Sequence, residues 1–165
     1  MKQVKTLLIA TALFFGATQV NAQTKIAHVN VEEIMTKMPA VIDAQKQVEK
    51  LTQTYEADFT TMRNELQTKL QKYATEVDKV SEAINKERQK EVDDMEKRIT
   101  EFGQTAQKEL QQKQMDLMKP IQLKIKASIE KVGKAKGFQY VADVASFIFA
   151  DGTDLTADVK KDLGF

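Results

Sequence analysis

Apolar residues recur every three or four positions along a stretch that runs from Pro39 to Val132. Apart from Gly103 and Pro120, the stretch contains no glycine or proline after Pro39, and Lys, Glu, Gln, Ala, Leu, Thr and Met dominate it. This spacing without turn signals predicts a long amphipathic helix or a helical hairpin and argues against a globular core.

The first half of the stretch has a regular apolar stripe whose steps of three, four and four close after 11 residues, or about 3.67 residues per turn. Because this period is close to that of a free helix, it predicts a nearly straight seam. The positions are Val48, Leu51, Tyr55, Phe59, Met62, Leu66, Leu70, Tyr73 and Val77.

Three short segments outside the stretch are predicted as strands from their β-branched and aromatic content. They are Lys25–Val31, Phe138–Ala142 and Ser146–Ala150. Two strands alone are marginal in water, so the first segment should join the other two. The long helix must then fold back, and the tip is predicted near Asn85–Glu91, where no apolar residue occurs.

The remaining signals complete an α+β fold, mostly α, in which a long antiparallel helical hairpin projects from a small β-rich body. Pro39 suits the first turn of a helix, and Gly133 is a stop signal. The other predicted elements are a short helix at Glu32–Lys37, a turn near Asp143–Ala145 and a last helix at Leu155–Leu163. The predicted boundaries are residues 39–132 for the hairpin and residues 23–38 and 133–165 for the body.

The N-terminus is typical of a secretion signal. Lys2 and Lys5 precede the apolar run Leu7–Ala17, and Ala22 is a small residue suited to signal peptidase. A membrane anchor is the alternative, but the run is far shorter than the roughly 20 residues that cross a bilayer. We therefore expect a periplasmic protein from which residues 1–22 are cleaved after Ala22.

Composition favours solvated helices that share their seams with other chains. Charged residues make up 30% of the chain, aromatic residues 7%, and tryptophan is absent, while the mean hydropathy is −0.43. Oligomerisation is expected because an isolated hairpin has little core of its own. Cleavage would change the net charge from +1 to about −1, which disfavours nucleic acid as a partner.

No residue pattern predicts catalysis, a cofactor or a metal site. The chain has no cysteine and one histidine, His28, which falls in a predicted strand and is expected to be structural. Glycine-rich phosphate loops and nucleophile elbows are absent from the sequence.

The stripe is unusual in its methionine and aromatic content, which suits either the hairpin and subunit seam or a surface for varied partners. The residues concerned are Phe59, Met62, Tyr73, Met95, Phe102, Met115 and Met118. Pro120 predicts a bend, which is either a harmless kink or a hinge between arm and body. The charged face is either simply solvated or an electrostatic grip on a client or on lipid head groups.

Several segments resemble the Skp/OmpH family of periplasmic chaperones, in order and over nearly the whole mature chain. They are Lys25–Asn30, Met38–Ala40, Lys119–Ile121, Gly137–Asp143, Phe149–Gly152 and Asp154–Val159, of which the last is the most specific. The resemblance implies a homotrimer with a β-rich body and three helical hairpins around a cavity. It also implies an ATP-independent holdase for unfolded outer-membrane β-barrel proteins, with transient membrane or lipopolysaccharide contact.

Within that resemblance, the residues expected in the trimer body are Ile26, Val29, Val31, Tyr140, Val141, Phe147 and Phe149. The main rival is a periplasmic coiled-coil spacer or adaptor, whose hairpins usually sit between β-domains that need more strands than this chain offers. A weak hydrolase is disfavoured because no catalytic constellation occurs.

Overall fold

The computed structural model describes residues 25–165, so the expected signal peptide and its cleavage site lie outside the described residues. The elements in order are β1 (Ile26–Val29), α2 (Val31–Lys37), α3 (Pro39–Glu76), the 3-10 helix η1 (Val77–Lys79), α4 (Glu82–Ala135), β2 (Tyr140–Asp143), the 3-10 helix η2 (Val144–Ser146), β3 (Thr153–Asp154) and α5 (Thr156–Leu163). The predicted α+β, mostly helical class is confirmed.

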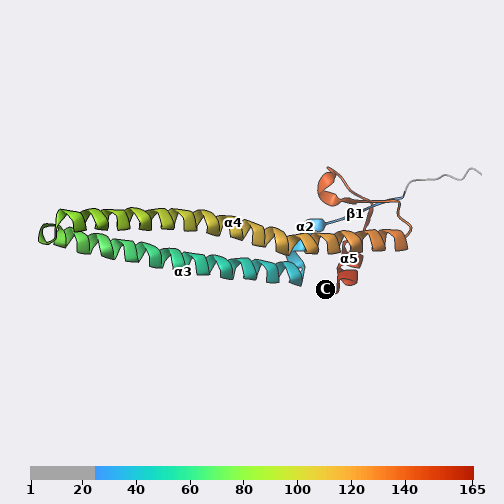
Figure 1. The fold of residues 1–165 in the computed structure, drawn as a ribbon. Coiled ribbons are helices and arrows are strands. Elements are labelled where there is room, and N and C mark those ends of the chain that lie inside the picture. The colour runs from blue at the N-terminus through green and yellow to red at the C-terminus, as the bar shows by residue number, and fades with distance from the viewer. Residues whose placement is uncertain (1–24) are drawn as a thin grey trace, which may run out of the picture.

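A two-helix hairpin dominates the molecule (Figure 1). The antiparallel helices α3 and α4 have 38 and 54 residues, and at 1.5 Å per residue α3 is about 57 Å long. As predicted, Pro39 occupies the first turn of α3. The longer α4 continues past the start of α3, and the strands and short helices of the body gather around its C-terminal part (Figure 1).

The tip of the hairpin is closer to the N-terminus than predicted. Helix α4 begins at Glu82, so Asn85–Glu91 is helical and the tip is η1 with the residues that follow it. Ser81 caps α4, because its hydroxyl accepts a hydrogen bond from the backbone N–H of Ile84. Residues Asn85–Glu91 lack apolar side chains because some of them, such as Arg88, make polar contacts with the other helix of the hairpin.

The sheet has the order β2-β1-β3, and both outer strands are parallel to β1. The predicted strand Ser146–Ala150 is wrong, because the third strand of the sheet is β3 and residues 147–150 belong to no helix or strand. The carboxylate of Asp143 accepts a hydrogen bond from the N–H of Ala145 at 3.2 Å, which initiates the turn at η2. The chain then leaves the sheet and returns on the other side of β1, where Thr153 aligns with Ala27.

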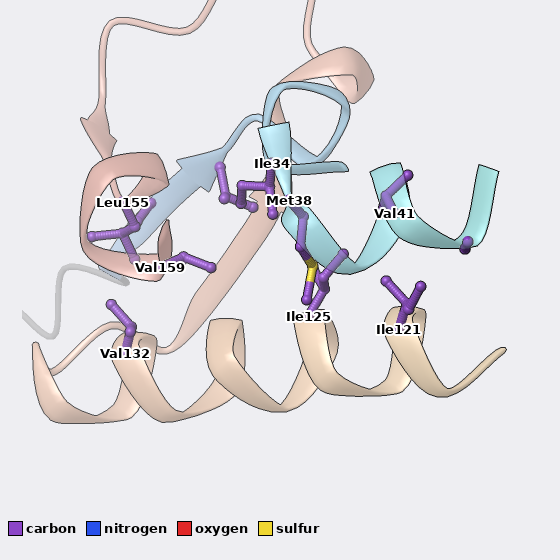
Figure 2. Close-up of a cluster of buried hydrophobic side chains, with 11 residues drawn as sticks. Ile34, Met38, Val41, Ile121, Ile125, Val132, Leu155 and Val159 are labelled. Atoms are coloured by element: carbon purple, nitrogen blue, oxygen red, sulfur yellow. The ribbon is translucent and has the colours of Figure 1, made fainter. Parts of the chain in front are cut away.

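One hydrophobic core joins the body to the base of the hairpin. Four side chains in it are fully buried, and they come from β1, α2 and the segment around α5: Val29, Ile34, Leu155 and Val159. Met38 and Val41 bring the start of α3 to this cluster, and Ile121, Ile125 and Val132 bring α4 (Figure 2). The arm therefore leaves the body from a packed junction.

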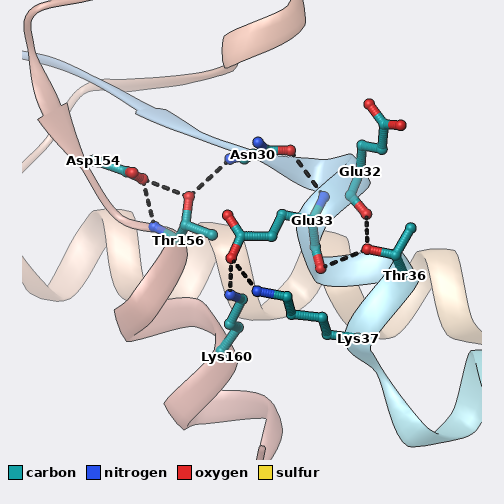
Figure 3. Close-up of polar contacts among 8 residues, drawn as sticks. All are labelled: Asn30, Glu32, Glu33, Thr36, Lys37, Asp154, Thr156 and Lys160. Atoms are coloured by element: carbon teal, nitrogen blue, oxygen red, sulfur yellow. Dashed lines mark hydrogen bonds and ion pairs between the residues drawn. The ribbon is translucent and has the colours of Figure 1, made fainter.

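A polar network covers the side of this core where α2 meets α5 (Figure 3). The N–H of Asn30 donates to the hydroxyl of Thr156 at 2.9 Å, while the Asn30 side chain caps α2 at Glu33. Glu33 also pairs with Lys37 at 2.9 Å and with Lys160 of α5. The Lys160 contact, followed by that with Lys37, lowers the pKa of Glu33 from 4.5 to about 2.

This network predicts an acid-sensitive contribution to stability. Because the pKa of Glu33 is lower in the folded state, its stabilising effect is full above about pH 4.5 and is lost as the pH falls toward 2. We measure the midpoint of urea unfolding by circular dichroism at several pH values. For Glu33→Gln, we expect this midpoint to fall less between pH 4.5 and about pH 2 than it does for wild type. Glu32→Gln is the matched control, since Glu32 is exposed and forms no ion pair among the described residues.

Gly133 is not the stop signal that the sequence predicted, because α4 continues to Ala135. Gly137, at a φ of 75°, follows the end of the helix. Gly133 is buried, and a Cβ there would lie 2.8 Å from Cγ2 of Val141 in β2. The glycine thus permits close packing of α4 against the sheet.

The two helical glycines provide a matched test of this packing. A Cβ at Gly103 would meet nothing nearer than Phe59 at 3.8 Å. Both Gly→Ala changes gain helix propensity, but only Gly133→Ala overpacks a stiff β-branched neighbour. We expect its free energy of unfolding to be about 1–3 kcal/mol below that of Gly103→Ala. Equal values in urea titrations would contradict this account.

Candidate functional site

The hairpin leaves much of its apolar stripe accessible. Among the 38 residues of α3, only Val41 and Ala44 are buried, and both lie near the body. Further out, the stripe residues of α3 are half-buried or exposed, and Leu70 is an exposed example. Two helices cannot enclose a wide stripe between them, so the arm carries apolar surface along its length.

Two of the predicted partner-binding residues meet in the middle of the arm. Phe59 and Phe102 line a hollow of about 390 Å³ with Tyr55 and Gly103. The rings of Tyr55 and Phe102 pack edge to face, with centroids 5.8 Å apart and an interplanar angle of 77°. The Tyr55 hydroxyl donates to Glu109, which raises the pKa of Tyr55. The structure thus combines an accessible aromatic surface with a polar contact that joins α3 to α4.

Nearer the tip, Tyr73 is engaged within the hairpin. Its hydroxyl donates to Glu91, which also pairs with Lys69, and these contacts lower the pKa of Glu91, with Lys69 the larger cause. The Arg88 guanidinium lies 4.5 Å from the centroid of the Tyr73 ring and pairs with Glu76 at 2.6 Å. This cluster fastens the two helices together near the tip.

The methionines that the sequence predicted to bind partners differ widely in burial. Met95 is only 6% exposed and lies in the hairpin seam, whereas Met115 is 58% exposed and Met62 is half-buried. Met118 lines a groove at the base of the arm. Pro120 is exposed and lies within α4, which continues through it.

We call that groove the base groove. It has a volume of about 700 Å³ and lies where α2, α3 and α4 come together. Its lining is Val31, Glu32, Met35, Thr36, Val41, Ala44, Gln45, Val48, Glu49, Thr52, Gln114, Leu117, Met118 and Asp143. The volume lies within the range of roughly 300–1,000 Å³ that ligand pockets occupy.

The residues expected in the trimer body separate into two groups. Val29 is buried in the core, and Val31 and Val141 pack against it. The other four are exposed: Ile26, Tyr140, Phe147 and Phe149. Ile26 and Tyr140 are register partners in the sheet, and Ile26, Phe147 and Phe149 line one shallow hollow.

Ile148 belongs with this exposed group but was not predicted. A strand at Ser146–Ala150 would have turned its side chain to the opposite face from Phe147 and Phe149. The segment is not a strand, and in it Ile148 is fully exposed and Phe149 is 81% exposed. In the sequence, the signal for this exposed apolar group is the run Phe-Ile-Phe at residues 147–149. We call Ile26, Tyr140, Phe147, Ile148 and Phe149 the sheet patch.

His28 is buried in β1, where it is 9% exposed. Gly152 lies close to it, since a Cβ on that glycine would be 3.8 Å from the His28 Nδ1. Residues 25–165 contain no group of three or more acidic, histidine or cysteine side chains arranged for a metal ion. No helix among these residues is long and apolar enough to cross a membrane.

Comparisons with known proteins agree over nearly the whole chain. The family profile described as "Outer membrane protein (OmpH-like)" matches residues 25–163. "Chaperone protein Skp" of Photorhabdus luminescens is 31% identical over 157 residues, covering 93% of this chain and 92% of that protein. The Skp protein of Pectobacterium atrosepticum is 25% identical over 147 residues, covering 88% and 89%.

A solved structure has the same fold. The crystal structure of a putative outer membrane chaperone (OmpH-like) from Caulobacter crescentus matches with a TM-score of 0.79 at 14% identity, covering 89% of this chain and 88% of that one. The chain therefore belongs to the OmpH-like family. Within it, the chain is a periplasmic chaperone of the kind that its Skp relatives represent, and those relatives are chaperones and not enzymes.

Proposed function

We propose that the chain is an ATP-independent holdase that keeps unfolded outer-membrane β-barrel proteins from aggregating. The observation that carries this proposal is the half-exposed apolar stripe of α3, along which buried residues occur only at the base. A barrel strand alternates apolar and polar side chains, so many shallow contacts along an arm can hold it without a deep pocket.

The proposal includes a homotrimer assembled through the sheet patch. Five apolar side chains exposed together on a small body are costly in water and typical of an association surface. Three arms around one space would multiply weak contacts into firm but reversible binding. Pro120 would act as the hinge that lets this space adapt to the client. We further propose export, with cleavage after Ala22.

The direct test uses light scattering. Purified mature protein is mixed with a urea-unfolded outer-membrane barrel protein, which is then diluted from urea without ATP. We expect scattering to be suppressed at a stoichiometric amount of trimer. Unchanged scattering, together with capture of one folded envelope protein, would support a spacer or adaptor in place of the holdase.

A further inference from the structure

The base groove is apolar at its floor and acidic at its rim. Seven of its lining residues are apolar: Val31, Met35, Val41, Ala44, Val48, Leu117 and Met118. Two of these are methionines, whose flexible side chains adapt to differently shaped occupants. Among the described residues, no lysine or arginine lines the groove, whereas three carboxylate side chains do: Glu32, Glu49 and Asp143.

These carboxylates are not neutralised by the protein itself. The ion pairs among the described residues involve Glu33, Glu76, Glu91, Glu101, Asp158 and Asp162, and none involves a groove carboxylate. Figure 3 shows the contrast, since Glu33 is held by Lys37 and Lys160 while the carboxylate of Glu32 points away from both. A groove with unpaired negative charge over an apolar floor favours an occupant that is apolar and basic.

We propose that the base groove binds unfolded polypeptide segments in which a large apolar side chain is followed or preceded by lysine or arginine. The apolar side chain would fill the floor beside Met118, and the basic side chain would lie along the wall with its charge at Glu32 or Glu49. Long basic side chains suit this position because their stems pack on apolar surface while their charge stays in water. The inference deepens the proposed function, since it names the segment of a client that binds closest to the body.

The test measures fluorescence anisotropy with two labelled peptides that share an alternating apolar sequence and carry either lysine or glutamate at the polar positions. We expect wild-type protein to bind the lysine peptide about tenfold more tightly, and raised salt to reduce the difference. The double variant Glu32→Gln, Glu49→Gln should weaken the lysine peptide about fivefold, as expected for two exposed charge pairs, and should bind the glutamate peptide at least as tightly as wild type because like-charge repulsion is removed.

Two further variants make the result specific to the groove. Glu65→Gln with Glu87→Gln removes two exposed arm carboxylates that form no ion pair among residues 25–165 and do not line the groove, and it should bind like wild type. Gln45→Trp places a large side chain at an exposed lining position and should weaken both peptides. Circular dichroism checks that each variant is folded.

The proposal is overturned if wild type binds both peptides equally, or if the groove double variant behaves like the arm control. It is also overturned if Gln45→Trp changes the native mass but not peptide binding, because the occupant would then be a second copy of the chain. If wild type fails to suppress barrel aggregation yet discriminates the peptides as expected, the holdase proposal fails and the groove proposal stands.

Discussion

Removing residues 57–74 and 90–107 together should abolish suppression of barrel aggregation while leaving the body folded and its assembly intact. Each deletion takes out about five turns at 3.6 residues per turn, so the stripe stays in phase and each arm loses about 27 Å. The cut keeps Tyr55 with Glu109 and Glu76 with Arg88, which pair on either side of the removed segments. It removes Phe59, Met62, Tyr73, Met95 and Phe102.

The expected loss is large because the contacts along the arms act together. If they bind one client multivalently, shortening the arms should reduce apparent affinity by roughly 10²-fold or more. Light scattering during dilution of an unfolded barrel protein measures the effect, and native mass and thermal unfolding report on the body. Full suppression by the short-armed protein would exclude the arms as the binding surface.

If the proposed trimer assembles through the sheet patch, the double change Ile148→Asp, Phe149→Asp should convert it into a folded monomer. Both side chains are highly exposed in the single chain, so the substitutions leave its own core untouched. Burying an isoleucine and a phenylalanine at an interface is worth roughly 3–6 kcal/mol in total. Their loss should therefore weaken association by about a hundredfold or more, and buried carboxylates would weaken it further.

Native mass spectrometry over a range of concentrations measures this change. Ile84→Asp is a suitable control, because Ile84 is also an exposed apolar residue but lies in the first turn of α4 at the far tip, where an acidic side chain is tolerated. The control should keep the wild-type mass. A double variant that also keeps it would show that the sheet patch is not the association surface.

Periodicity predicted the long helices, and the hairpin followed from the expected pairing of the strand before the helical stretch with a strand after it, which the structure confirms as β1 and β2. The three-to-four spacing from Val48 onward defined α3, and Pro39 marked its start. The predicted tip is wrong because the apolar gap at Asn85–Glu91 lies inside α4, and the better signal in the sequence is Ser81, which caps that helix. In a two-helix arm, a polar stretch can be helical when its side chains pair across the hairpin, as Arg88 does with Glu76.

The sheet was harder to predict because its strands are short and its connections depend on local polar contacts. A strand of two residues, Thr153–Asp154, carries almost no pattern of its own. The turn initiated by Asp143 redirected the chain away from the expected pairing, and it exposed Ile148 with its aromatic neighbours. The apolar residues of this segment predicted a strand, but the sequence did not show that they lie outside the sheet and are exposed.

The sequence also did not show which of the predicted partner-binding residues of the arm are buried and which are exposed. Spacing places Met95 and Met115 on the same broad stripe, yet the first is buried in the seam and the second is exposed. The difference depends on which partner helix faces each position, and the sequence of one helix does not contain this information. The base groove was missed for the same reason, since α2, α3 and α4 each contribute to it.

The most direct test of the central claim is the native mass of the complex formed when an unfolded outer-membrane barrel protein is diluted into the mature chain without ATP. The chain contains no tryptophan, so tryptophan emission from the same sample reports the client alone. We expect one species of three chains with one client, and emission typical of an unfolded, unaggregated client. A client that precipitates while the chain stays free, or that binds to single chains, would contradict the account.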